Sequence, residues 1–297
     1  MRRAPPANGL ESNEPLDGDP FAGHPDPSSI LSPIMLQSAL MNVMVKAARR
    51  AGRSLKRDLG EIENLQVSLK GPANFVSLAD KRAEDILYEE LSKARPGYGF
   101  FGEEGGNREG TDKSHTWIVD PLDGTTNFLH GIPHFGISIG LQRDGVLIAG
   151  LVYNPANDEL YTAERGKGAF LNDQRLRVSG RRQMNDCVIA CGLPHIGRGD
   201  HELSRREMAA LQPKVAGLRR FGAASLDLAF VAAGRVDGYW ERNLQPWDIA
   251  GGQIIVREAG GIVSGIQGDD DPLTTGDVIC GNEFVHAELV KIIKPLG

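Results

Sequence analysis

A stretch of twelve residues near the middle of the chain places two carboxylates between an apolar segment and a helix start. It reads Trp117-Ile118-Val119-Asp120-Pro121-Leu122-Asp123-Gly124-Thr125-Thr126-Asn127-Phe128. The apolar residues before Asp120 predict a short buried strand that ends at this carboxylate. Pro121 favours a turn, and Gly124 frees the backbone for the next one. We expect a helix to follow, with Thr125 or Thr126 as its cap.

Two acids three residues apart beside a helix N-terminus can hold a hard cation and a phosphate together. Taken alone, the stretch is equally consistent with an Asp-rich turn and its N-cap. Two further segments change that balance, Phe101-Gly102-Glu103-Glu104 upstream and Trp247-Asp248-Ile249-Ala250-Gly251-Gly252 downstream. Each places an acid beside small residues or a turn, so the three together favour a shared metal centre.

The three segments, in this order, resemble the inositol monophosphatase family of Mg²⁺-dependent, lithium-sensitive phosphatases. That family carries a Gly-Glu-Glu element, an Asp-Pro-(Ile/Leu)-Asp-Gly-Thr-Thr-Asn element and a late Trp-Asp-x-Ala-Gly element. The segment Phe75-Val76-Ser77-Leu78-Ala79-Asp80 is similar to the family's early acidic motif. The resemblance extends from about Leu31 to the C-terminus. One departure is Asn74, where many relatives have Asp.

The resemblance implies two or three Mg²⁺ ions per site. Glu103, Asp120 and the backbone carbonyl of Leu122 are expected to hold the first ion. Asp120, Asp123 and Asp248 are expected to hold the second, with Asp120 as the bridge. A third, weaker ion is expected near Glu103.

The resemblance also implies which residues act on the substrate. The nucleophilic water is expected near Glu103 and Thr125, with Asp80 hydrogen-bonded to Thr125. The implied substrate contacts are Asp123, Gly124, Thr125, Ala224, Glu241 and Asp248. Glu241, in Tyr239-Trp240-Glu241, matches an acid that binds inositol hydroxyls in the family. The alternative for Glu241 is a surface acid at a strand end.

The resemblance and the segment pattern predict an α/β (α+β) fold, a layered αβαβα sandwich of the inositol monophosphatase and fructose-bisphosphatase type. Residues 1–29 are rich in Pro, Gly, Asp and Asn, and we expect them to be disordered. Residues 30–185 are expected to form a metal-binding α+β half. Residues 186–297 are expected to form an α/β half that completes the site and binds substrate.

Apolar periodicity predicts the individual elements. A long helix is expected from Pro33 through Leu55, and a second helix is expected to begin at Asp80. Period-two alternation over 134–171 predicts an antiparallel meander, with Arg165–Gly168 as a hairpin turn rather than a phosphate loop. Strands are expected at 188–191, 218–221, 238–240, 261–263 and 278–279. Helices are expected at 202–211, 224–233, 248–258 and 283–293.

Composition limits the classes of partner and compartment. The net charge of −6 disfavours a general nucleic-acid binder. The three cysteines, Cys187, Cys191 and Cys280, lack zinc-type spacing and predict buried thiols in a reducing compartment. No run of 18 apolar residues predicts a membrane span, and no apolar segment follows Arg2 and Arg3 to suggest a secretory signal. We therefore expect a cytoplasmic protein.

The leading interpretation is a phosphatase acting on inositol 1-phosphate and related polyol or sugar phosphates. Histidinol phosphate, a nucleotide 3′-phosphate and fructose bisphosphate are alternative substrates within the superfamily. A third interpretation is an interaction protein in transcription and ribosomal RNA maturation, with or without phosphatase activity. The resemblance also implies a homodimer. His130, His134 and His195 are expected to be structural.

Overall fold

The computed structural model describes residues 38–60, 67–69, 75–195, 197–268 and 271–297. The prediction for residues 1–29 and the departure at Asn74 lie outside these residues. From Gln37 to the C-terminus the chain forms one compact unit, and the following description concerns that unit alone. Its proposed division into a metal-binding half and a substrate-binding half stays a prediction.

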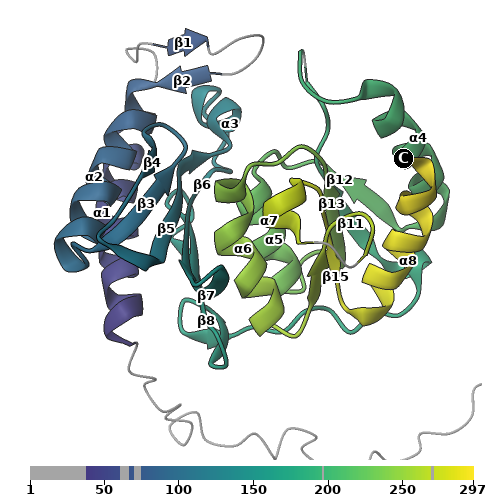
Figure 1. Ribbon diagram of the computed structural model, residues 1–297. Coiled ribbons are helices and arrows are strands. Elements are labelled where there is room, and N and C mark those ends of the chain that lie inside the picture. Colours follow the sequence, from purple (N-terminus) through teal and green to yellow (C-terminus); the bar gives the residue numbers. More distant parts are fainter. Residues whose placement is uncertain (1–37, 61–66, 70–74, 196, 269–270) are drawn as a thin grey trace, which may run out of the picture. The chain divides into compact units, whose positions relative to one another are not determined.

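Five layers of secondary structure follow one another across this unit (Figure 1). Helices α1 (Ala39–Leu59) and α2 (Leu78–Ala94) cover the outer face of a large sheet. Helices α5 (Ala224–Ala232) and α6 (Pro246–Glu258) lie between that sheet and a smaller one. Helices α4 (His201–Leu211) and α8 (Glu283–Ile293) cover the far face of the smaller sheet. The predicted αβαβα sandwich is confirmed.

The large sheet has the strand order β10-β9-β8-β7-β6-β5-β3-β4. Its strands are β3 (Tyr98–Gly102), β4 (Gly106–Arg108), β5 (Asp112–Asp123), β6 (Gly136–Arg143), β7 (Val146–Asn154), β8 (Glu159–Glu164), β9 (Gly168–Leu171) and β10 (Gln174–Arg175). From β5 to β10 every neighbouring pair is antiparallel, which confirms the predicted meander. Only β3 and β5 are paired in parallel within this sheet, so the segments that follow both strands emerge at one edge.

The smaller sheet has the order β12-β11-β13-β15-β14. Its strands are β11 (Val188–Cys191), β12 (Gly217–Arg219), β13 (Gly238–Glu241), β14 (Ile262–Ser264) and β15 (Val278–Gly281). The pairs of β11 with β12 and β13 are parallel, and those of β15 are antiparallel. The remaining elements are short: β1 (Val67–Leu69), β2 (Phe75–Ser77), α3 (Thr125–Leu129), α7 (Pro272–Thr275), and 3₁₀ turns at Met184–Asp186, Gln212–Lys214 and Lys294–Leu296.

Two glycines bring α6 close to the large sheet. Gly140 and Gly150 face each other across β6 and β7. A Cβ at Gly140 would lie 2.6 Å from the Cβ of Ala250, and one at Gly150 would lie 2.3 Å from Ile254. Only glycine allows this approach. At the start of the helix, the Ser138 hydroxyl also donates to the carbonyl of Trp247 at 3.1 Å. The acid that follows, in the first turn of α6, is thereby held near the end of β5.

Several boundaries differ from the sequence-based expectations. Strand β5 does not end at Asp120 but continues to Asp123, with a register shift between these residues in its pairing with β6. Helix α1 begins at Ala39, where the Ser38 side chain accepts a hydrogen bond from the N–H of Met41. Helix α2 begins at Leu78, which places Asp80 in its first turn. In the second half of the chain the predicted strands and helices are all present, with ends that differ by two residues at most.

The predictions for thiols and the 165–168 turn are confirmed. Cys187, Cys191 and Cys280 are free and buried. Gly166 adopts a positive φ of 77° in the turn between β8 and β9. The carboxylate of Glu258 accepts hydrogen bonds from the N–H groups of Gly166 and Gly168, both at 2.8 Å. The turn is thus anchored to the end of α6 and has no phosphate-loop geometry.

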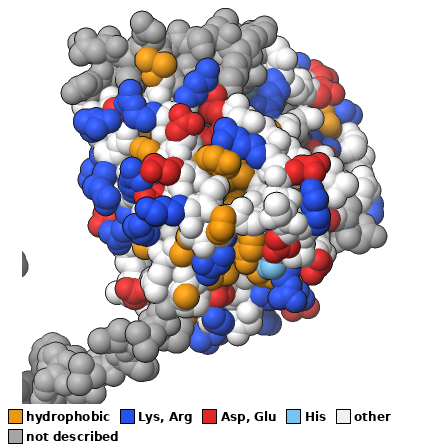
Figure 2. Space-filling model, turned by 60° about the vertical axis from the view of Figure 1, so that its left-hand side comes forward, with side chains coloured by type: hydrophobic (Ala, Val, Ile, Leu, Met, Phe, Trp, Pro, Cys, Tyr) orange, Lys and Arg blue, Asp and Glu red, His pale blue; other side chains and the backbone are white. Residues whose placement is uncertain are grey.

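Basic and acidic side chains are mixed on the α1–α2 side of the molecule. Figure 2, in which this side comes forward, shows many Lys and Arg side chains with Asp and Glu among them. Glu90 of α2 pairs with Lys46 and Arg50 of α1, and Arg82 pairs with Asp58. These ion pairs join α1 to α2. Among the residues described, no helix is both long enough and apolar enough to cross a membrane.

Candidate metal and phosphate site

A cavity of about 910 Å³ opens where the ends of β3, β5 and β13 meet α5 and α6. Its lining contains almost every residue singled out in the sequence. The predicted residues in the lining are Glu103, Asp120, Leu122, Asp123, Gly124, Thr125, Ala224, Glu241 and Asp248. These residues come from five segments spread over about half of the chain, so the fold brings the predicted set together.

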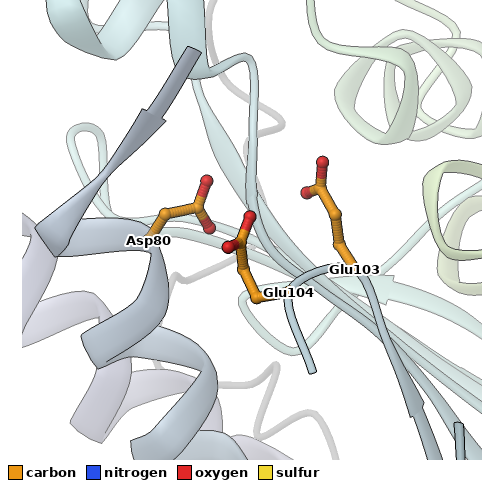
Figure 3. A group of neighbouring side chains, drawn as sticks. All are labelled: Asp80, Glu103 and Glu104. Carbon is orange, nitrogen blue, oxygen red and sulfur yellow. The ribbon is translucent and has the colours of Figure 1, made fainter. Parts of the chain in front are cut away.

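Three carboxylates gather where α2 faces the turn after β3. Figure 3 shows Asp80 from the helix and Glu104 from the turn directed towards each other, with Glu103 beside them. One oxygen from each of the three lies within 4.8 Å of the others. Asp80 is 1% exposed. The N–H of Glu103 donates to the carbonyl of Val119 at 3.3 Å, which ties this turn to the strand that carries Asp120.

Asp120 lies at the irregular end of β5. One of its carboxylate oxygens accepts the N–H of Leu122 at 2.9 Å. The carbonyl of Leu122 accepts the hydroxyl of Thr125 at 3.0 Å. The predicted cap is therefore wrong: Gly124 occupies the N-cap of α3 with φ 87°, and no side chain caps this helix. The Thr125 hydroxyl instead fixes the carbonyl that was predicted to face a metal. The predicted bond between Asp80 and Thr125 stays a prediction.

Asp123 is held by the start of α5. Its carboxylate accepts the N–H of Ala224 at 3.2 Å, the N–H of Ser225 at 2.7 Å and the hydroxyl of Ser225 at 2.6 Å. A carboxylate at a helix N-terminus is stabilised by these N–H groups and by the helix dipole. The backbone of Ala224 thus positions Asp123. This contact joins residues about a hundred positions apart.

Asp248 sits in the first turn of α6 and forms a capping box with Gln245. Its carboxylate accepts the N–H of Gln245 at 2.8 Å. Asp120 and Asp248 line the same cavity, and their carboxylates interact electrostatically. Next to Asp248, the ring of Trp247 packs edge-on against Phe101 with centroids 5.1 Å apart. The helix start is therefore fixed against the strand that leads to Glu103.

The electrostatics of this carboxylate group are unfavourable when all its members are ionised. Burial, followed by repulsion from Glu103, Asp123 and Asp248, raises the pKa of Asp120 well above its usual value. Burial and repulsion from Asp123 raise the pKa of Asp248 to about 7. Burial also raises the pKa of Asp123, although the hydrogen bonds from Ser225 and Ala224 oppose this. Crowded carboxylates, of which Asp120 and Asp123 are buried and Glu103 and Asp248 half-buried, suit a hard divalent cation such as Mg²⁺.

The far end of the cavity holds Glu241. Its carboxylate accepts the hydroxyl of the buried Tyr239. It also lies directly against the backbone of Gly192, where an added Cβ would come within 1.7 Å of the Glu241 Cδ. Burial raises the pKa of Glu241 to about 7. Glu241 is therefore a half-buried residue of the cavity lining at the end of β13, and its role in substrate binding stays a prediction.

Some residues of the site were missed. Glu104 belongs to the carboxylate group although only Glu103 was predicted as a ligand. Arg198 and Arg220 line the cavity, and no short motif marks them. His134 is structural as predicted, since its ring packs against Phe221 and Phe230 at 5.4 and 5.5 Å. His195, in contrast, lines the cavity.

Known proteins resemble the chain over most of its length. The model of the inositol monophosphatase family matches residues 36–296. An inositol-1-monophosphatase of Mesorhizobium japonicum is 60% identical over 88% of this chain and 98% of its own length. Nus factor SuhB of Escherichia coli K12 is 42% identical over 83% of this chain and 92% of its own.

Solved structures resemble the chain as well. The extragenic suppressor protein suhB of Bartonella henselae has a TM-score of 0.85 and 57% identity, covering 86% of this chain and 99% of that protein. An inositol monophosphatase of Anabaena (Nostoc) has a TM-score of 0.75 and 32% identity, covering 87% and 96%. The chain therefore belongs to the inositol monophosphatase family, a family of phosphatases.

Proposed function

We propose that this protein is a Mg²⁺-dependent phosphatase that hydrolyses inositol 1-phosphate and related polyol or sugar phosphates. The observation that carries the proposal is the convergence of Asp120, Asp123 and Asp248 with Glu103 on one cavity, next to a glycine-led helix start. Relatives at 52–60% identity named inositol-1-monophosphatase support the choice of substrate.

The carboxylates would hold two or three Mg²⁺ ions in the arrangement that the family implies. Glu103, Asp120 and the Leu122 carbonyl would hold one, and Asp120, Asp123 and Asp248 the second. Glu104 and Asp80, which lie within 4.8 Å of Glu103, would assist a weaker ion there. When bound, Mg²⁺ would neutralise phosphate charge, supply an activated water and stabilise the leaving oxygen.

The residues of the chain would orient the ester and the water. The N–H groups of Gly124 and Thr125 lie at the start of α3, beside the carboxylates, and would donate hydrogen bonds to phosphate oxygens. Glu103 and Thr125 would position the water. Asp123, fixed by Ala224 and Ser225, would keep its oxygens towards the cavity. No side-chain nucleophile is needed.

Glu241 would accept a hydroxyl of the polyol. Its carboxylate is already oriented by Tyr239 and by the contact with Gly192. Binding would therefore cost little side-chain conformational entropy. A ring with several hydroxyls gains more from such an acceptor than a simple alkyl phosphate does. Glu241 therefore favours inositol 1-phosphate over substrates without a matching hydroxyl.

The test is a phosphate-release screen with inositol 1-phosphate, histidinol phosphate, a nucleoside 3′,5′-bisphosphate and fructose bisphosphate. We expect the fastest turnover on inositol 1-phosphate, an absolute need for Mg²⁺, and inhibition by Li⁺ and by excess Mg²⁺. Full activity in the presence of EDTA would contradict the metal mechanism. A faster rate on any other of these substrates would contradict the assignment of inositol 1-phosphate as the substrate and leave the metal mechanism intact.

A second role is favoured by one observation, the relatives at 41–46% identity named as established or putative Nus factors. We propose that this protein also binds a component of the transcription machinery, and that it is cytoplasmic and a homodimer. Capture from native lysate by an Asp248→Asn variant would support binding independent of catalysis. Capture that is lost with the variant or at background level would contradict it.

A further inference from the structure

The turn that carries Glu103 and Glu104 is wrapped around the carboxylate of another acid, Glu84 of α2. Glu84 is 2% exposed, and it is not among the residues predicted for the site. Its Oε2 accepts the N–H of Glu104 at 2.8 Å. Gly105 lies against the other oxygen of this carboxylate. One buried side chain thus contacts two consecutive residues of the turn.

Two glycines let the turn approach this closely. A Cβ on Gly102 would lie 2.4 Å from the Oε2 of Glu84, and a Cβ on Gly105 would lie 2.6 Å from its Oε1. The segment Gly102-Glu103-Glu104-Gly105 is therefore shaped to enclose the carboxylate, with a glycine on either side of the two glutamates. A larger residue at either glycine would push the turn away from Glu84.

The same face of α2 contacts the hairpin at two more points. Asp80, Glu84 and Tyr88 follow one another at four-residue spacing and lie on one side of the helix. Tyr88 packs edge-on against Phe100 at 5.2 Å between ring centroids. The guanidinium of Arg108 lies 4.1 Å from the centre of the Tyr88 ring. Tyr88 thus contacts both strands of the hairpin, while Asp80 reaches its acidic turn.

We propose that Glu84 is a positioning residue for the cation site: through the N–H of Glu104 and its contact with Gly105 it fixes the turn so that Glu103 and Glu104 face Asp80. This inference rests on the proposed Mg²⁺-dependent function. The attachment matters because three carboxylates gather between the turn and α2 and, when ionised, repel one another in the absence of a cation. A turn without Glu84 loses the acceptor of the Glu104 N–H and moves to find another one.

The experiment compares the wild-type protein with Glu84→Gln, Glu84→Asp and a matched control, Asp85→Asn. Asp85 is the exposed neighbour of Glu84 on the same helix. Mg²⁺ affinity is measured by titration calorimetry without substrate, and Tm is measured in EDTA and in saturating Mg²⁺. We expect Glu84→Gln to weaken Mg²⁺ binding about 10–100-fold, the range for residues that orient metal ligands. The rise in Tm caused by Mg²⁺ should shrink with it.

The control and the shorter acid sharpen the outcome. Asp85→Asn should bind Mg²⁺ as the wild type does. Glu84→Asp keeps the charge but withdraws it from the turn, so its affinity should also fall, and it serves if Glu84→Gln does not fold. Wild-type affinity in the folded Glu84 variants, or an equal loss of Tm with and without Mg²⁺, would overturn the inference. A wild-type protein that binds no Mg²⁺ would overturn the proposed function itself.

Discussion

The two ends of the cavity compensate their buried acids by different means. At one end, Asp120, Asp123 and Asp248 repel one another, and their pKa values are raised. At the other end, the carboxylate of Glu241 accepts a hydrogen bond from the hydroxyl of Tyr239 and packs against the backbone of Gly192. A cation would stabilise the first end, whereas at the second end the acid is already oriented by its neighbours. Catalysis should therefore depend on the first and selection of the polyol on the second.

The largest effect is expected from Asp248→Asn at the carboxylate end. The substitution removes one charged oxygen from the proposed second Mg²⁺ site while it leaves an acceptor for the N–H of Gln245. We expect kcat to fall at least about a hundredfold, as with the loss of a strong electrostatic contact in the transition state. Steady-state kinetics at several Mg²⁺ concentrations would measure it. An unchanged kcat would remove Asp248 from the metal site.

Glu241→Ala should instead act through substrate affinity. A lost hydrogen bond to a polyol hydroxyl costs about 1–3 kcal/mol when its partner is buried. We expect this loss as a higher KM for inositol 1-phosphate, with a much smaller change for a simple alkyl phosphate. Equal losses of kcat on both substrates would show that Glu241 is not a specificity residue.

Gly192→Ala provides a second way to test the same end. Its Cβ would occupy the place of the Glu241 carboxylate, so Glu241 must move although its own chemistry is intact. We expect a similar rise in KM for inositol 1-phosphate in this variant. In the double variant the two effects should not add, because both remove one contact. Additive effects would mean that Gly192 acts independently of Glu241.

The sequence predicted the carboxylate end better than it predicted the support of that end. Asp120, Asp123 and Asp248 each stand in a local motif between apolar and small residues, and the order of these motifs carries the family resemblance that implies their role. The contact between Asp123 and Ser225 could not be found this way, since it joins segments that only the tertiary fold brings together. The four-residue spacing of Asp80 and Glu84 was a readable signal that both lie on one helix face.

The layered fold was predictable because period-two and helical patterns are strong over long segments. The errors fall where one residue decides local geometry. Pro121 favoured a turn, yet β5 continues with a register shift to Asp123, because pairing with β6 holds both sides of the irregularity. Thr125 was expected as a cap, but Gly124 takes the left-handed N-cap conformation. The hydroxyl of Thr125 is thereby free to donate to the carbonyl of Leu122.

The smallest expected effect is a difference in the pH dependence of stability. A carboxyl whose pKa is raised in the folded state stabilises the fold below its unfolded pKa, and this stability is lost as the pH rises through the folded pKa. For Asp248 and Glu241 the window runs from about pH 4 to slightly above pH 7. In EDTA, Tm should therefore fall between pH 5 and pH 8. Mg²⁺ should remove the part due to the carboxylate end, because the cation stabilises the ionised form.

Glu241→Gln isolates the part of the pH dependence of Tm that is due to Glu241. This variant cannot ionise at position 241. The difference between its Tm and that of the wild type should therefore be more favourable to the variant at pH 8 than at pH 5, with Mg²⁺ present or absent. We expect about 1 kcal/mol after allowance for partial solvent screening, or about 2 °C in Tm for a chain of this size. Thermal melts at both pH values, with and without Mg²⁺, measure it. If Mg²⁺ abolished the difference between Gln and Glu at position 241, the cation would be compensating Glu241 as well. The two ends would then be one electrostatic unit rather than two.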